Sequence, residues 1–169
     1  MSGSAPKYRL QPVLDKKQKQ KDEAQEALAR VQAELREEEE RKTALENELE
    51  QLKQDRAEAR RRQQEEMLTK GMSGMGAGRI QSFVKGQEVR EEQKGAEILE
   101  QGKVIEKVRF KLEEQKLILT EAAREVQGME KHRDEWLAKL RKEAEEKEAK
   151  EMDEIGTAIH LQRQRREEG

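Results

Sequence analysis

Apolar residues recur along the chain at alternating steps of three and four positions, in two separate stretches. The steps begin at Leu28 in the first stretch and at Ile98 in the second. This spacing places apolar side chains on one stripe of an α-helix and is typical of a coiled coil. The pattern therefore predicts two long helices, at about 11–69 and about 80–166, each with a narrow apolar seam. The seam positions singled out are Leu28, Leu35, Leu45, Leu49, Leu52, Ile98, Ile105, Val108, Leu112 and Leu119.

A glycine-rich segment separates the two stretches. Four glycines lie between positions 71 and 78, and glycine disfavours a helix because it gains so much conformational freedom when the helix unfolds. We therefore expect a loop at about 70–79, where the chain turns back on itself. A short connection between two helices favours antiparallel pairing. The predicted fold class is all-α, a long antiparallel two-helix coiled-coil hairpin.

The two seams can be aligned about a turn at position 75. This register pairs Leu14 with Trp136 and Leu45 with Ile105. It leaves the second helix unpaired beyond about residue 142, as a C-terminal overhang. We expect residues 1–7 to be disordered, as chain termini often are, and residues 8–169 to form one hairpin domain.

Composition limits what the chain can be. Charged residues make up 44% of the sequence and hydrophobic residues 32%, which excludes a large globular core. Acidic and basic residues are interleaved and the net charge is −2, whereas a nucleic-acid-binding domain usually has a basic excess. We therefore expect no nucleic-acid partner.

The residues that carry catalysis or metal binding are missing or scattered. There is no cysteine, and the two histidines, His132 and His160, have no second histidine at metal-ligand spacing. The glycine-rich segment lacks the Gly-Lys-Ser/Thr ending of a phosphate-binding loop. We expect no enzyme activity and no cofactor. No apolar run is long enough for a membrane span, so we expect a cytoplasmic protein without membrane insertion.

Apolar residues also gather near the turn and away from the seams. Those near the turn either close the tip on itself or form a docking patch for a protein. Gly86, Gly95 and Gly102 predict that this half of the hairpin is the looser one. Phe110 and Leu117 miss the seam and hint at a second contact surface. The predicted tip residues are Met67, Met72, Met75, Ile80, Phe83 and Val84.

Three short segments resemble one known family. They are residues 8–14 (YRLQPVL), 132–137 (HRDEWL) and 148–156 (EAKEMDEIG). Together they are similar to the opening and closing signatures of the type III secretion stalk proteins. These are the YscO/SctO proteins of injectisomes, with FliJ as their flagellar relative. The closing pattern of a tryptophan and Asp-Glu-Ile-Gly resembles the chlamydial-type YscO proteins.

This resemblance implies a function for the hairpin. Family members lie in or at the central pore of a hexameric secretion ATPase, connect it to the export gate membrane protein, and bind export chaperones. The resemblance implies that the tip faces the export gate, and that the open end, which carries both termini, faces the ATPase. The open-end residues are Tyr8, Arg9, Leu10, Lys17, Lys21, Trp136, Met152, Asp153, Glu154, Ile155 and Ile159.

The sequence leaves three alternatives open. The first is a flagellar rather than an injectisome role, and the second is a passive coiled-coil tether or a prefoldin-like holdase. The third is self-association into a four-helix bundle through the exposed apolar residues, although a monomer is the expected state. The overhang supports a partner-binding role, because Met152, Ile155 and Ile159 form an apolar stripe with no partner in the hairpin.

Overall fold

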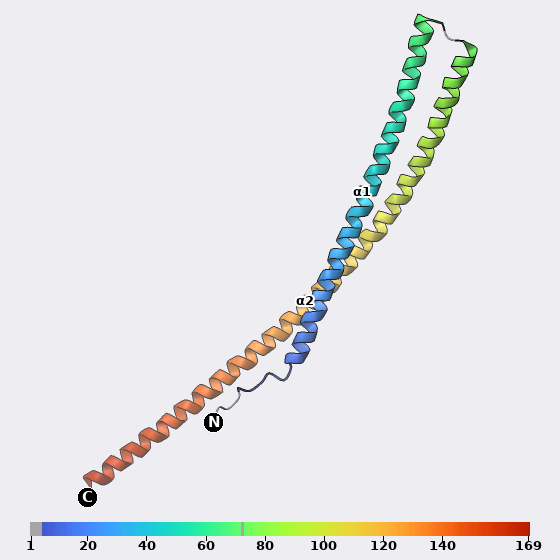
Figure 1. The fold of residues 1–169 in the computed structure, drawn as a ribbon. Helices are drawn as coiled ribbons and strands as arrows, with labels where there is room; N and C mark the ends of the chain where they lie inside the picture. Colours follow the sequence, from blue (N-terminus) through green and yellow to red (C-terminus); the bar gives the residue numbers. More distant parts are fainter. Residues whose placement is uncertain (1–4, 72) are drawn as a thin grey trace. The chain divides into compact units, whose positions relative to one another are not determined.

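The computed structural model describes residues 5–71 and 73–169, and their secondary structure consists of two α-helices. Helix α1 spans Gln11–Thr69 and helix α2 spans Gly74–Glu167 (Figure 1). The helices pack against each other in opposite directions and no strand occurs in the described residues, so the predicted all-α hairpin is confirmed. The structure divides into two units. The terminal unit contains the residues up to Glu23 together with Leu119–Gly169, and the loop unit contains Ala24–Ile118.

Helix α1 begins where its sequence favours a start. The Gln11 amide donates a hydrogen bond to the Tyr8 carbonyl at 3.1 Å, and the Leu14 amide donates to the Leu10 carbonyl at 2.9 Å. Pro12 lies in this first turn, where its missing N–H removes no helical hydrogen bond. These contacts begin the helix at the predicted position.

The connection between the helices is shorter than the predicted loop at 70–79. Gly71 has φ of 65°, a left-handed conformation that glycine adopts without a Cβ clash, and it ends α1. The Ser73 hydroxyl then accepts a hydrogen bond from the Gly76 amide at 3.2 Å, which caps the start of α2. The prediction of a loop to residue 79, with α2 starting at about 80, was therefore wrong. A serine cap begins the helix at Gly74 in spite of the glycines that follow.

The seam is the core of both units. Val108 in the loop unit and Val126 in the terminal unit are each 2% exposed, and all ten seam side chains singled out from the sequence are buried or half-buried. The same alternation continues from Ile98 back to Ile80, so the seam extends farther toward the turn than predicted. The added positions are Lys94, Glu91, Gln87, Val84 and Ile80, all buried or half-buried.

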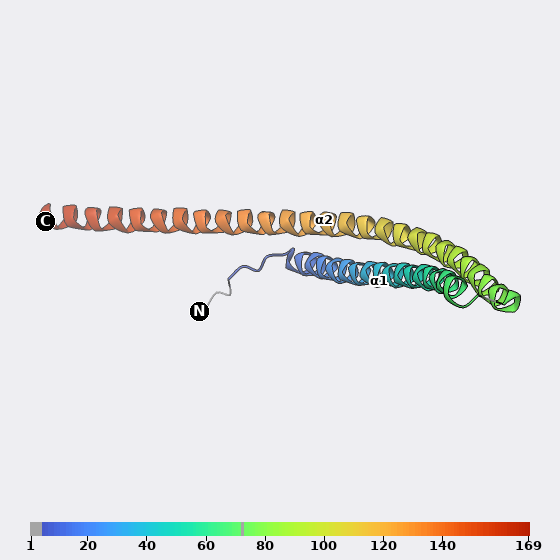
Figure 2. The same ribbon diagram turned by 90° about the horizontal axis from the view of Figure 1, so that it is seen from above.

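The register differs from the one predicted about position 75. In the terminal unit Lys17 pairs with Glu125 at 2.8 Å, whereas the predicted register places it opposite Arg133. In the loop unit the Gln101 side chain donates to the Glu38 carbonyl at 3.0 Å, whereas the predicted register places Glu38 opposite Leu112. Each partner on α2 lies nearer the turn than predicted. The physical reason is the early start of α2, which moves the centre of the turn toward the N-terminus. Figure 2 shows the end of α1 and the start of α2 from a second direction.

Charged side chains in and beside the seam of the loop unit join the helices. Lys94 pairs with Glu48 at 2.7 Å, and hydrogen bonds from its ammonium to Glu48 and Glu97 raise the pKa of Lys94. Arg56 donates to Glu91 at 2.8 Å. The Lys94–Glu48 pair is open to solvent on the Glu48 side, where water and salt screen it, and the Arg56–Glu91 pair is partly buried. They set which residues face each other more than they stabilise the hairpin.

One polar side chain in the seam lacks a partner. Gln87 is 4% exposed, and its Oε1 accepts no hydrogen bond from the described residues. We expect Gln87→Leu to raise the free energy of unfolding by about 1–2 kcal/mol, because it removes a desolvated acceptor and adds apolar contact. Urea unfolding followed by circular dichroism measures the change.

The matched control for Gln87→Leu is the same substitution at another seam position. The Gln101 amide donates to both the backbone carbonyl and the carboxylate of Glu38, at 3.0 and 2.5 Å. We expect Gln101→Leu to lower stability by about 1 kcal/mol, because it removes these bonds. Equal gains from both substitutions would contradict the assignment of Gln87 as the unsatisfied group.

Candidate interaction surfaces

An aromatic cluster lies at the start of α1 in the terminal unit. The ring centroids of Tyr8 and Trp136 are 5.3 Å apart with the rings tilted, a favourable aromatic arrangement. The Tyr8 hydroxyl is hydrogen-bonded to His132 Nδ1 at 2.6 Å. Trp136 is half-buried against Tyr8, so the predicted pairing of Trp136 with Leu14 was wrong. The cluster ties the segment before α1 to α2.

The other predicted open-end residues of this segment differ in exposure. Arg9 and Leu10 are exposed, and Lys21 is half-buried in the seam. Lys17 is also half-buried and is held by Glu125, so its charge is already partnered inside the hairpin. Arg9 and Leu10 are therefore the members of this group with the most surface available for another molecule.

The overhang is the longest uncovered surface of the terminal unit. Helix α2 continues past the beginning of α1, and every residue from Arg141 to Gly169 is exposed (Figure 1). Met152, Ile155 and Ile159 are 65%, 54% and 47% exposed, and their spacing places them on one side of the helix. Asp153 and Glu154 are exposed beside them. The apolar stripe of this helix is therefore open to contact with another molecule.

The predicted tip set is divided by the structure. Met67, Met75 and Phe83 are exposed, at 58%, 76% and 46%. Val84 is buried in the seam and Ile80 is half-buried, so these two side chains close the loop unit instead of offering a docking surface. Met72 lies outside the described residues. The exposed tip surface is therefore smaller than predicted.

Some residues of the two charge runs contact the opposite helix of the hairpin. In the run 37–40, Glu38 accepts from Gln101, and Glu39 pairs with Arg109 at 3.2 Å. Hydrogen bonds to Glu39 and Glu106 raise the pKa of the Arg109 guanidinium. In the run 60–62, Arg60 pairs with Glu88 on α2 at 3.0 Å. The sequence could not show this, because it depends on the true register.

Neither a metal centre nor a membrane-spanning element is found in the part of the chain that the structure describes. No three histidine, cysteine or acidic side chains there come together as metal ligands. Neither α1 nor α2, over its described residues, has a window apolar enough to cross a membrane.

Comparisons with known proteins agree with this architecture. A family model described as YscO-like protein matches residues 5–166. CT670 from Chlamydia trachomatis, a proposed YscO homolog of known structure, is similar with a TM-score of 0.75 and 24% sequence identity, over 95% of this chain and 99% of CT670. At that identity the structural likeness shows the fold. A comparison with curated proteins found no match. The family match covers nearly the whole sequence, and the chain therefore belongs to the YscO-like family of stalk-type type III secretion proteins.

Proposed function

We propose that this chain is the central stalk protein of a type III secretion system, binding a hexameric secretion ATPase and coupling it to the export gate. The role is non-catalytic and is carried out at the cytoplasmic face of the secretion apparatus. Export chaperones are further partners. The YscO-like family match supports a role in a type III secretion system. Its description as YscO-like favours an injectisome role over a flagellar one.

The uncovered overhang is the observation that carries this proposal. Its apolar stripe lies on a helix that is exposed on all sides in the terminal unit. Between residues 143 and 154 the overhang has seven acidic and two basic residues. A basic groove with an apolar floor would complement it. A stripe of three apolar side chains can also be released and rebound, which a partner that changes state during ATP hydrolysis requires.

Mixing the purified chain with the cognate secretion ATPase tests the proposal. We expect direct binding and a change in the rate of ATP hydrolysis, measured by interferometry and by phosphate release. Binding should weaken as salt rises, because the acidic flank contributes through exposed charges. A chain that neither binds the ATPase nor alters hydrolysis at low salt would contradict the proposed function. A passive tether or holdase would give that result and would bind unfolded clients instead.

A further inference from the structure

Helix α2 of the loop unit carries a second apolar line on the side away from its seam. Leu99, Phe110 and Leu117 are 72%, 66% and 71% exposed. Their separations of 11 and 7 residues place them on one side of the helix, because an α-helix completes whole turns at nearly these intervals. The seam residues Ile105 and Val108 lie on the opposite side and are buried. Between Leu99 and Phe110, the same side of the helix carries Lys103 and Glu106 at heptad spacing. We call these four residues the outer stripe.

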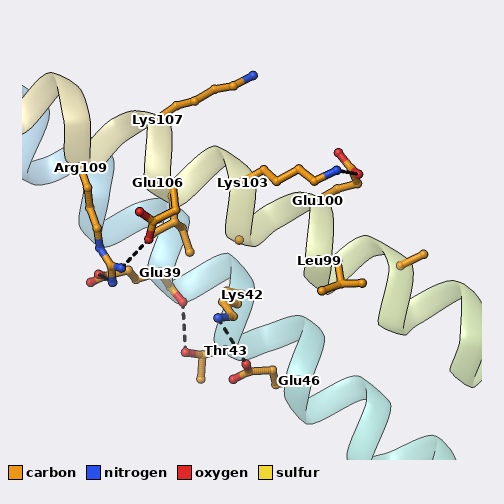
Figure 3. Close-up of a pocket in the computed structure, with 13 residues that line it drawn as sticks. Glu39, Lys42, Thr43, Glu46, Leu99, Glu100, Lys103, Glu106, Lys107 and Arg109 are labelled. Carbon is orange, nitrogen blue, oxygen red and sulfur yellow. Dashed lines mark hydrogen bonds and ion pairs between the residues drawn. The ribbon is translucent and has the colours of Figure 1, made fainter.

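A groove runs beside the outer stripe, between α2 and α1 of the loop unit. It has a volume of about 1050 Å³ and is lined by Leu99, Gly102 and Glu106 on one side and by Lys42 and Glu46 on the other (Figure 3). A Cβ added at Gly102 would meet nothing within 4 Å. Leu99 therefore stands beside open space that is wide enough to receive a side chain from another molecule.

We propose that the outer stripe binds the outer stripe of a second copy of this chain, antiparallel and related by a two-fold axis. In this alignment Leu99 meets Phe110 of the second copy, and Lys103 meets Glu106. The symmetry repeats both contacts, which is how an isologous interface satisfies each residue twice. Phe110 of the second copy would lie on Leu99 at the mouth of the groove, where Gly102 leaves room for its ring.

The order of charges supports this alignment over its neighbours. The flanking positions bring Glu100 of one copy beside Lys107 of the other, again twice. Moving the alignment by one heptad brings Lys107 beside Lys107 and Arg109 beside Arg109. A parallel pairing places Lys103 against Lys103 and Glu106 against Glu106. Like charges at such positions are unfavourable, so the residue order favours the proposed alignment over these two alternatives.

The existing contacts of these side chains are compatible with the pairing. Lys103 now bonds Glu100 at 2.7 Å, which lowers the pKa of that carboxyl, and Glu106 accepts from Arg109 at 2.9 Å. All are exposed ion pairs that can be shared or exchanged at little cost. With two leucine–phenylalanine contacts as its apolar part, the interface is small, and such interfaces are reversible. The inference goes beyond the proposed function, because it uses no residue of the overhang. It proposes a dimer where a monomer was expected.

Charge exchange in the full-length chain tests the pairing. We expect sedimentation velocity to show a monomer–dimer equilibrium that rises with concentration. Lys103→Glu or Glu106→Lys alone should lower the association constant by at least about tenfold, because each places like charges together twice. The combination of both should restore it. The control is Lys53→Glu, the same charge change at an exposed position of α1 outside the groove, which should leave association unchanged.

Engineered cysteines test the alignment, and the chain has no cysteine of its own to interfere. Chains carrying Leu99→Cys and Phe110→Cys, mixed and oxidised, should form the mixed disulfide in preference to either symmetric one. Preferential Leu99→Cys homodimers would indicate a parallel pair and overturn the alignment. A monomer at every concentration overturns the proposal. So does a dimer that is indifferent to the charge reversals.

Discussion

Replacing Val108 with aspartate is expected to lower the free energy of unfolding by about 4 kcal/mol. The side chain is 2% exposed in the seam of the loop unit. The substitution removes the apolar contacts of a buried valine, worth about 1.5–3 kcal/mol, and leaves a carboxylate without a partner among aliphatic side chains. A two-helix hairpin has only this one narrow core. Urea unfolding followed by circular dichroism measures the loss.

The matched control for Val108→Asp lies one helical turn away. Val104 is 39% exposed on the same helix, and Val104→Asp removes the same side chain and adds the same charge. We expect this variant to lose no more than about 1 kcal/mol, mostly from the lower helix propensity of aspartate. Equal losses at both positions would mean that the hairpin is not held together along this seam.

The seam could be predicted from the sequence because its period is the period of the helix itself. A regular alternation of three and four positions, starting at Leu28 in one helix and at Ile98 in the other, identifies the side chains that face the partner helix. The structure buries or half-buries all ten. Helix α1 ends at Thr69, as predicted, because Gly71 takes a left-handed conformation two residues later.

The register could not be predicted, because it depends on a few residues at the turn. Averaged helix propensity treats Gly74, Gly76 and Gly78 as helix breakers, whereas a single cap at Ser73 decides where α2 begins. A start several residues earlier moves the partners along both helices. The error reached the aromatic cluster, where Tyr8 and not Leu14 packs on Trp136.

The candidate surfaces were predictable where they depend on one helix and not where they depend on two. The overhang follows from a second helix longer than the first, so its stripe was identified correctly as exposed. Val84 lies in the seam and not at the tip surface, and the sequence hides this because the seam positions between it and Ile98 are polar. The groove beside Leu99 depends on how α1 and α2 meet, and no periodicity in either helix reveals it.

Replacing Met152, Ile155 and Ile159 together with glutamine is expected to weaken binding to the secretion ATPase by at least about 100-fold. All three side chains are about half exposed or more and contact no part of α1, so they are available to a partner. Glutamine is a good helix former with a side chain of similar length, so the overhang should stay helical. Binding and ATP hydrolysis are measured in the mixture used to test the proposed function.

The matched control for this variant lies on the same overhang. Leu161 is 50% exposed and lies nine positions after Met152, which places it on the opposite side of the helix. We expect Leu161→Gln to bind and stimulate like the natural chain. Circular dichroism should give the same helix content for both variants, because none of the four side chains is part of the seam. A common loss of helix would instead attribute the weaker binding to unfolding.

The two variants also distinguish a wrong contact surface from a wrong function. If the natural chain binds the ATPase and the triple variant binds equally well, the overhang is not the contact surface, although the stalk role stands. If the triple variant binds but no longer changes hydrolysis, the stripe is needed to alter the hydrolysis rate, and another part of the terminal unit is sufficient for binding. The exposed Arg9 and Leu10 would then be the next residues to replace. If Leu161→Gln weakens binding as much as the triple change, the ATPase encloses the whole helix, as a ring around a shaft would.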